Sequence, residues 1–107
     1  MFTRVVDIRT KPGKANELCN TTNEKVLPIL RKQQGFQDEI ILVSQTDPNN
    51  VLLLSFWSKR EDAERYHREH FARITEMVRP LCDSDPTVKP FEVNTSTPHH
   101  ISLGKAA

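Results

Sequence analysis

Three short apolar stretches of the chain have the length and composition of β-strands. Residues 2–9, 36–46 and 51–57 are rich in Val, Ile, Leu and Phe, and Pro, Gly, Asn or Asp residues separate them. In each stretch, both alternating sets of residues include apolar side chains. A strand with two apolar faces is normally covered on both sides. We therefore expect a sheet with other structure packed against each of its faces.

A helix is predicted between residues 14 and 33, where apolar residues recur at spacings of three and four. Gly35 follows this stretch and provides a C-terminal stop. Pro28 lies inside the stretch and removes one amide donor from the helical hydrogen bonds. We therefore expect a kink, or a break into two helices, near Val26.

A second helix is predicted from Ser58 to Val78, and it carries the most unusual residue pattern of the chain. Ser58 and Glu61 have the spacing of a capping box. The opposite faces of this helix differ, because one is charged and solvated and the other is mainly apolar. The apolar face contains Ala63, His67, His70, Phe71, Ile74, Met77, Val78 and Leu81. Two imidazoles on an apolar face make it the first candidate for a functional site.

The order of the predicted elements is β-α-β-β-α-β, with a last strand at residues 87–94. Pro90 favours an edge position for that strand. This order predicts an α+β, ferredoxin-like fold, in which a four-stranded antiparallel sheet carries both helices on one face. The helices cannot cover the second apolar face, so we expect a homodimer packed sheet to sheet. The domain is expected to span residues 1–96, and a polar C-terminal tail to span residues 97–107.

Composition restricts the possible functions. The chain has 107 residues, enough for one domain, and its 15 basic and 14 acidic residues argue against a nucleic-acid partner. It has no apolar run long enough to span a membrane, and its first residues do not resemble a signal peptide, so we expect a cytoplasmic protein. Cys19 and Cys82 are expected to be free thiols in the core.

The chain resembles the antibiotic biosynthesis monooxygenase (ABM) domain of the dimeric α+β barrel superfamily. The resemblance covers about residues 2–96. It rests on the element order and on Pro12-Gly13, Gly35-Phe36, Phe56-Trp57-Ser58, Tyr66-His67 and Val88…Phe91-Glu92-Val93. It implies a homodimer with one pocket per subunit, between the sheet and its helices. Characterised relatives oxidise phenols or quinols with O₂ and without metal or flavin, others degrade haem, and some have no known chemistry.

The chain also departs from the residue patterns of its relatives. It matches none of the three positions used by haem-degrading relatives, which disfavours haem breakdown. Polyketide-oxidising relatives combine a Trp at the strand exit with an Asn, a Tyr and an Arg. Only Trp57 matches them, and Leu53 stands at the Asn position. Quinol-oxidising relatives carry His residues near the position of His67.

His67 is the candidate general base. A cofactor-independent oxygenase needs a base that ionises the substrate and a dry pocket in which the anion passes an electron to O₂. Imidazole titrates near neutrality, and an apolar wall favours its neutral, proton-accepting form. The alternative is a buried His bonded to a backbone carbonyl. Asp7 is the second catalytic candidate, as a base or as a partner that orients His67, unless it pairs with a neighbouring Arg.

Four further side chains form the candidate substrate-binding set. Trp57 would stack on an aromatic substrate, or else pack in the core or a dimer interface. Tyr66 would offer a hydroxyl to a substrate oxygen, or else pack at the helix edge. His70 would orient the substrate, although a place at the wet edge of the apolar face is favoured. Phe71 lies on the same line of the helix as His67 and completes the set.

A metal site is the less favoured interpretation of the same helix. Glu64, His67 and His70 have helical ligand spacings, but a metal needs three or four converging ligands. His99 and His100 would complete such a site only if the tail folds back. We therefore expect neither a metal nor another cofactor.

The function expected from the sequence is a cofactor-independent monooxygenase that oxidises a small aromatic or quinol-like compound with O₂. The alternative is a non-catalytic small-ligand-binding or isomerase-like dimeric α+β barrel protein. Both interpretations stay open, because most residues known from characterised relatives are missing.

Overall fold

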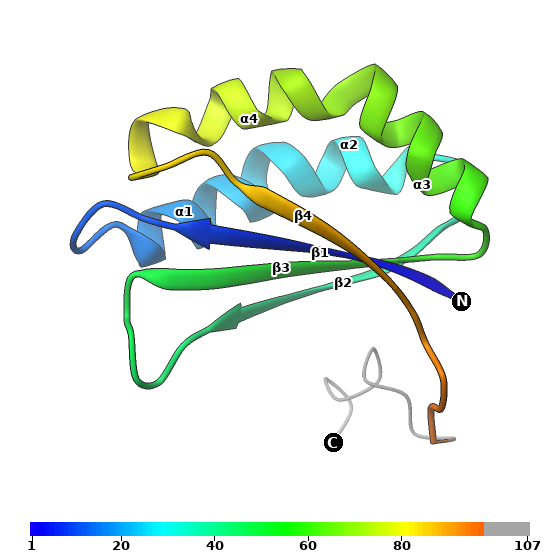
Figure 1. The fold of residues 1–107 in the computed structure, drawn as a ribbon. Helices are drawn as coiled ribbons and strands as arrows, with labels where there is room; N and C mark the ends of the chain where they lie inside the picture. The colour runs from blue at the N-terminus through cyan, green and yellow to red at the C-terminus, as the bar shows by residue number, and fades with distance from the viewer. Residues whose placement is uncertain (98–107) are drawn as a thin grey trace.

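The computed structural model describes residues 1–97, and they form the predicted βαββαβ arrangement (Figure 1). The strands are β1 (Phe2–Arg9), β2 (Phe36–Val43), β3 (Asn50–Trp57) and β4 (Thr87–Glu92). All neighbouring strands are antiparallel, in the order β2-β3-β1-β4. The helices lie on one face of this sheet (Figure 1). The predicted ferredoxin-like α+β fold is therefore confirmed.

The first helical segment is disturbed where the sequence predicts it. It consists of α1 (Ala15–Thr21), the π-helical turn η1 (Thr22–Val26) and α2 (Leu27–Arg31). Pro28 lies in the first turn of α2, where a missing amide donor is tolerated. The widened turn therefore adapts the helix to Pro28 without ending it.

Gly35 ends this segment for two physical reasons. Its φ of 83° lies in the left-handed region that favours glycine. The buried Asp62 side chain also packs directly on it, so that a Cβ at position 35 would lie 2.1 Å from the Asp62 Oδ2 atom. This close approach anchors the start of the second helical segment against the β2 entry.

The second helical segment differs from the single regular helix expected. It consists of α3 (Arg60–Tyr66), the π-helical turn η2 (His67–Phe71), α4 (Ala72–Val78) and the 3₁₀ turn η3 (Arg79–Leu81). The capping-box prediction is wrong, because no side chain caps α3 and the Ser58 hydroxyl accepts a hydrogen bond from Gln37 instead. The widened turn η2 contains both His67 and His70, and the angular spacing of its residues differs from that of a regular α-helix. The two His of this segment therefore do not share one apolar face.

The hydrophobic core lies between the helices and the sheet. One cluster packs around Ile8, Leu18 and Val51, and a second around Trp57, Ala63 and Leu30. Cys82 is buried and Cys19 half-buried, and both thiols are free. Burial raises the pKa of both thiols, so they remain protonated near neutrality.

The other face of the sheet is also apolar, and no helix covers it in the described part of the chain (Figure 1). We call it the open face. Its apolar side chains are Val5, Ile40, Leu42, Leu52, Leu54, Phe56 and Phe91. Leu42 and Phe91 are the most accessible of these, at 46% and 53% exposed. Strand β4 pairs only with β1 and forms the sheet edge, as Pro90 predicts.

No helix within residues 1–97 is long and apolar enough to cross a membrane. Residues 98–107, which include His99 and His100 and most of the predicted tail, lie outside the described residues.

Candidate functional site

A row of polar side chains crosses the helix-covered face of the sheet. Arg4 of β1 pairs with Ser55 of β3, and Ser55 pairs with Glu39 of β2. Directly paired residues of antiparallel strands point to the same side, so these three side chains form a line. We call it the polar row. The neighbouring lines are apolar, formed by Val6, Leu53 and Ile41 on one side and by Phe2, Trp57 and Phe36 on the other.

An inner cavity lies between the polar row and the helices. Tyr66, Phe71 and Ile74 contribute to its helical wall, and all three members of the polar row line it. Its volume, measured as the space open to the centres of water molecules, is about 40 Å³. That is room for a few water molecules, whereas a cavity of roughly 150 Å³ is known to admit benzene. An aromatic ligand therefore requires the cavity to widen.

Arg4 is the central cation of this site. It is only 5% exposed, and its guanidinium carbon lies 5.2 Å from the centre of the Tyr66 ring and 4.9 Å from that of Phe71. Burial lowers the pKa of Arg4, but a guanidinium stays charged at any physiological pH. No carboxylate of the described residues forms an ion pair with it. Because a buried, unpaired charge is costly, this position favours an anionic ligand.

His67 is bonded to this cation. Its Nδ1 atom lies 2.8 Å from the Arg4 Nη2 atom, and its ring stacks on Phe71 with 4.8 Å between the centres. Since arginine can only donate, Nδ1 accepts this hydrogen bond, and the neutral ring carries its proton on Nε2. Desolvation, and then the charge of Arg4, lower the pKa of His67. The imidazole is therefore neutral as expected, but it is largely exposed and its lone pair is already used.

A second, larger hollow lies on the outer side of Arg4. It has a volume of about 370 Å³, and we call it the outer groove. Its lining comes from β1, α3, η2 and β4 and includes Phe2, Arg60, Glu64, His67 and Val88. Arg4 lines both hollows, so its side chain is part of the wall between them.

Trp57 and Tyr66 have different places relative to the inner cavity. Trp57 is fully buried, packs against Phe36 and Tyr66, and donates from Nε1 to the Ser55 Oγ atom at 2.9 Å. Trp57 lies beside the polar row on the same face of the sheet, holds the Ser55 side chain in place, and does not line the cavity. Tyr66 does line it. Burial raises the pKa of Tyr66 to about 12, an effect that Arg4 opposes, so its hydroxyl remains a hydrogen-bond donor.

His70 and Phe71 both lie in the π-helical turn η2, but they differ in their relation to the inner cavity. Phe71 lines the inner cavity. His70 does not, and its Nδ1 accepts a hydrogen bond from Arg73 at 3.0 Å. The half-buried His70 ring packs beside Tyr66 with 5.9 Å between the centres. His70 therefore supports Tyr66 from outside the cavity.

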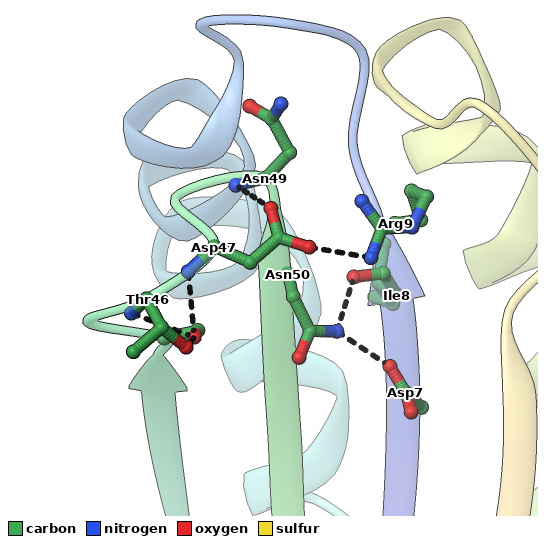
Figure 2. A network of polar contacts seen from close by, with 8 residues as sticks. Asp7, Ile8, Arg9, Thr46, Asp47, Asn49 and Asn50 are labelled. Atoms are coloured by element: carbon green, nitrogen blue, oxygen red, sulfur yellow. Dashed lines mark hydrogen bonds and ion pairs between the residues drawn. The ribbon is translucent and has the colours of Figure 1, made fainter.

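Asp7 lies on the open face, away from the other candidates. Strand alternation places it opposite to Arg4, Val6 and Ile8. Its Oδ1 accepts a hydrogen bond of 2.7 Å from Asn50 Nδ2, as Figure 2 shows. Nearby, Arg9 pairs with Asp47 at 2.6 Å. This network ties the β2–β3 turn to β1, and it does not bring Asp7 to His67.

The sequence interpretation missed all three members of the polar row. Glu39 is half-buried, and burial raises the pKa of its carboxyl to about 7. Arg4 interrupts an otherwise apolar alternation in β1, and that interruption is the signal from which it could have been found. Glu39 reaches the same side as Phe36 only through the register shift in β2. Within residues 1–97, no three His, Cys, Asp or Glu residues gather as a metal site would require.

The profile of one family, antibiotic biosynthesis monooxygenase, matches residues 1–77 of the chain. No curated protein sequence is recognisably similar to it.

Solved structures of the same architecture are numerous, and the following three are distant in sequence. A Bordetella bronchiseptica protein classed with the antibiotic biosynthesis monooxygenases superposes with a TM-score of 0.78 at 14% identity, over 88% of this chain and 97% of its own. A monooxygenase from the ActVA-Orf6 gene of Streptomyces coelicolor, in complex with nanaomycin D, superposes with a TM-score of 0.78 at 17% identity, over 90% of this chain and 89% of its own. A Methanosarcina mazei protein superposes with a TM-score of 0.69 at 21% identity, over 86% of this chain and 92% of its own. At these identities the similarity establishes the fold alone.

Proposed function

Because the chain belongs to the antibiotic biosynthesis monooxygenase family, we propose that it is a cofactor-independent monooxygenase that oxidises a small aromatic or quinol-like compound with O₂. The observation that carries this proposal is the polar row beneath the inner cavity. Arg4 and Tyr66 supply donors for a substrate oxygen, and the remaining walls are mainly apolar. This combination stabilises an anionic substrate while it excludes bulk water.

The proposed reaction inserts one oxygen atom into a hydroxyarene. Loss of the hydroxyl proton makes the ring electron-rich enough to pass an electron to O₂. Recombination at a ring carbon gives a peroxide, which collapses to a quinone and water. One O₂ thus accepts four electrons from the substrate, and its second oxygen atom leaves as water. The chain's own contribution is to bind, orient and ionise the substrate.

The outer groove supplies the space that the inner cavity lacks. A displacement of the Arg4 side chain would join the two hollows, since this residue lines both. A substrate that enters from the groove would meet Arg4, His67 and then Tyr66 and Phe71. In this arrangement His67 positions Arg4, and it becomes free to act as a base only when Arg4 leaves its Nδ1 atom.

We also infer that two copies of the chain pair through their open faces. The apolar residues on that face lie on all four strands, and Leu42 and Phe91 are substantially exposed. Exposed apolar patches of this kind mark association surfaces. Sedimentation velocity tests this inference, and a monomer at micromolar concentration would contradict it.

Oxygen consumption with a panel of hydroquinones and naphthols tests the proposed activity. Wild type is expected to consume O₂ and form a quinone, while Tyr66→Phe and Arg4→Gln lose at least about tenfold in kcat/KM, the equivalent of about 1.4 kcal/mol. His67→Ala provides the separate test of this residue as a base, and an unchanged rate would remove it from that role. Thermal stabilisation by these compounds without O₂ uptake would instead favour the ligand-binding alternative.

A further inference from the structure

Glu39 is the only carboxyl group of the described residues that lines the inner cavity. Its cross-strand partner is Ser55, and Arg4 follows on the next strand, so the carboxyl and the guanidinium lie at opposite ends of the polar row. Neighbouring strands are about 4.8 Å apart, which places these two ends roughly 10 Å from each other at the backbone. Among the described residues the two side chains form no ion pair with each other, and a single aromatic ring can lie between them once the cavity widens.

We propose that Glu39 is the proton acceptor of this site and that its ligand is an aromatic ring with an acidic hydroxyl at one end and a conjugated oxygen acceptor at the other. The hydroxyl points to Glu39, and the acceptor oxygen points to Arg4 and Tyr66. This assignment rests on the proposed function for the location of the ligand.

The surroundings of Glu39 fit this role. Within residues 1–97 it forms no ion pair. Burial affects its pKa more than Arg31, which lowers the pKa, or Asp38, which raises it, and Tyr66 is the titratable group of the helical wall that interacts with it. Burial holds the pKa of the carboxyl at about 7, so both of its forms are populated near neutrality. A group with this property accepts and returns a proton with little cost. Ser55, whose oxygen already accepts a bond from Trp57, keeps its own proton to donate into the row.

The proton transfer is balanced within the site. The substrate O–H bond breaks, and a new O–H bond forms on the Glu39 carboxylate. The electron pair stays on the substrate and moves through the ring towards the second oxygen. Arg4, which has no carboxylate partner among the described residues, stabilises the charge that arrives there.

Anaerobic binding of 4-nitrophenol tests this proposal without turnover. The probe has a hydroxyl and a conjugated acceptor at opposite ends, and its anion is yellow. In a pH titration, wild type is expected to bind the probe as the anion, with an apparent pKa at least one unit below that of the free probe. Glu39→Gln, which keeps the shape of the side chain, is expected to bind it in the colourless, neutral form at the same pH. Glu76→Gln removes an exposed carboxyl of α4 that lines neither hollow, and it should behave as wild type.

Each result decides the proposal. A bound anion in Glu39→Gln would overturn the role of Glu39. Failure of wild type to bind the probe would overturn the ligand assignment. Loss of the anion in Glu76→Gln would show that the bound anion does not report on Glu39 and would overturn the proposal as well. Formation of the anion in wild type without O₂ uptake on any hydroxyarene would support Glu39 while it removes the proposed monooxygenase function.

Discussion

Each face of the sheet departs in its own way from the usual distribution of polar and apolar side chains. The helix-covered face holds Arg4, Ser55 and Glu39, whereas the open face holds a broad set of apolar residues that includes Leu42 and Leu54. Burying charged groups is costly, and exposing a large apolar surface risks association. We propose that each departure has a use that compensates for its cost, a ligand on the covered face and a second copy on the open one.

The largest expected effect comes from a charge on the open face. In Leu54→Glu each copy of a dimer would bury a carboxylate at the centre of the interface, at the middle of β3. The dissociation constant is expected to rise at least about 100-fold, or about 2.8 kcal/mol. Sedimentation velocity measures this change, with Lys25→Glu on the exposed surface of η1 as the control. An unchanged dimer would place the interface elsewhere.

On the covered face, an apolar replacement is expected to separate activity from stability. Glu39→Met removes the proton acceptor and should lower kcat/KM at least about tenfold. The same change removes a half-buried polar group and should raise the free energy of unfolding by about 1 kcal/mol near pH 8. Chemical denaturation and oxygen consumption measure the two quantities. The control Glu76→Met, at an exposed position of α4, should leave kcat/KM and the free energy of unfolding nearly unchanged. If Glu39→Met lowered kcat/KM and the free energy of unfolding in parallel, Glu39 would be a purely structural residue.

The stability of the wild type should depend on pH through Glu39. The pKa of its carboxyl rises from 4.5 to about 7 on folding, so the folded state binds more protons between these values. Stability is therefore expected to fall as pH rises through this window. His67, whose pKa is lowered, acts with the opposite sign, because stability is lost as pH falls through its folded pKa. Urea unfolding of wild type and Glu39→Gln at about pH 5 and about pH 8 should show a flatter profile for the variant, and identical profiles would contradict the raised pKa.

His67 distinguishes positioning from base catalysis. If it holds Arg4, His67→Ala should raise KM about three- to tenfold with little change in kcat, and His67→Asn, whose amide oxygen can accept from Arg4, should restore KM. A kcat loss beyond about 100-fold in both variants would identify His67 as the base.

The smallest effect is expected at Asp7. Asp7→Asn lies on the open face and retains an oxygen that accepts from Asn50. Steady-state kinetics should stay within about twofold of wild type, and stability within about 0.5 kcal/mol. A large loss of kcat would show that Asp7 reaches the reacting groups after all.

The sequence predicts the fold well because its strongest patterns are local. Two apolar faces on the strands, Pro90 at an edge and Gly35 after the first helix each follow from the conformational limits of a few residues, and the structure confirms them. The site depends instead on which residues of different strands and turns meet, and local patterns carry little of that information.

Two irregularities explain what the sequence interpretation missed. The register shift between Phe36 and Asp38 adds one residue to β2, so Phe36 and Glu39 face the same side although simple alternation separates them. The π-helical turn η2 similarly leaves Phe71 in the cavity wall and His67 at the exposed edge. Neither irregularity has a clear sequence signal, and each one changes the face of the strand or helix on which the neighbouring side chains lie.

The most direct test of the account is a map of where a ligand binds. Amide NMR shifts of the wild type, titrated anaerobically with 4-nitrophenol, report on both faces of the sheet at once. We predict the largest shifts at Arg4, Ser55 and Glu39 on the covered face, with Leu42 and Leu52 on the open face unaffected. Shifts confined to the open face, or to the outer groove around Glu64, would contradict the assignment of the site to the polar row.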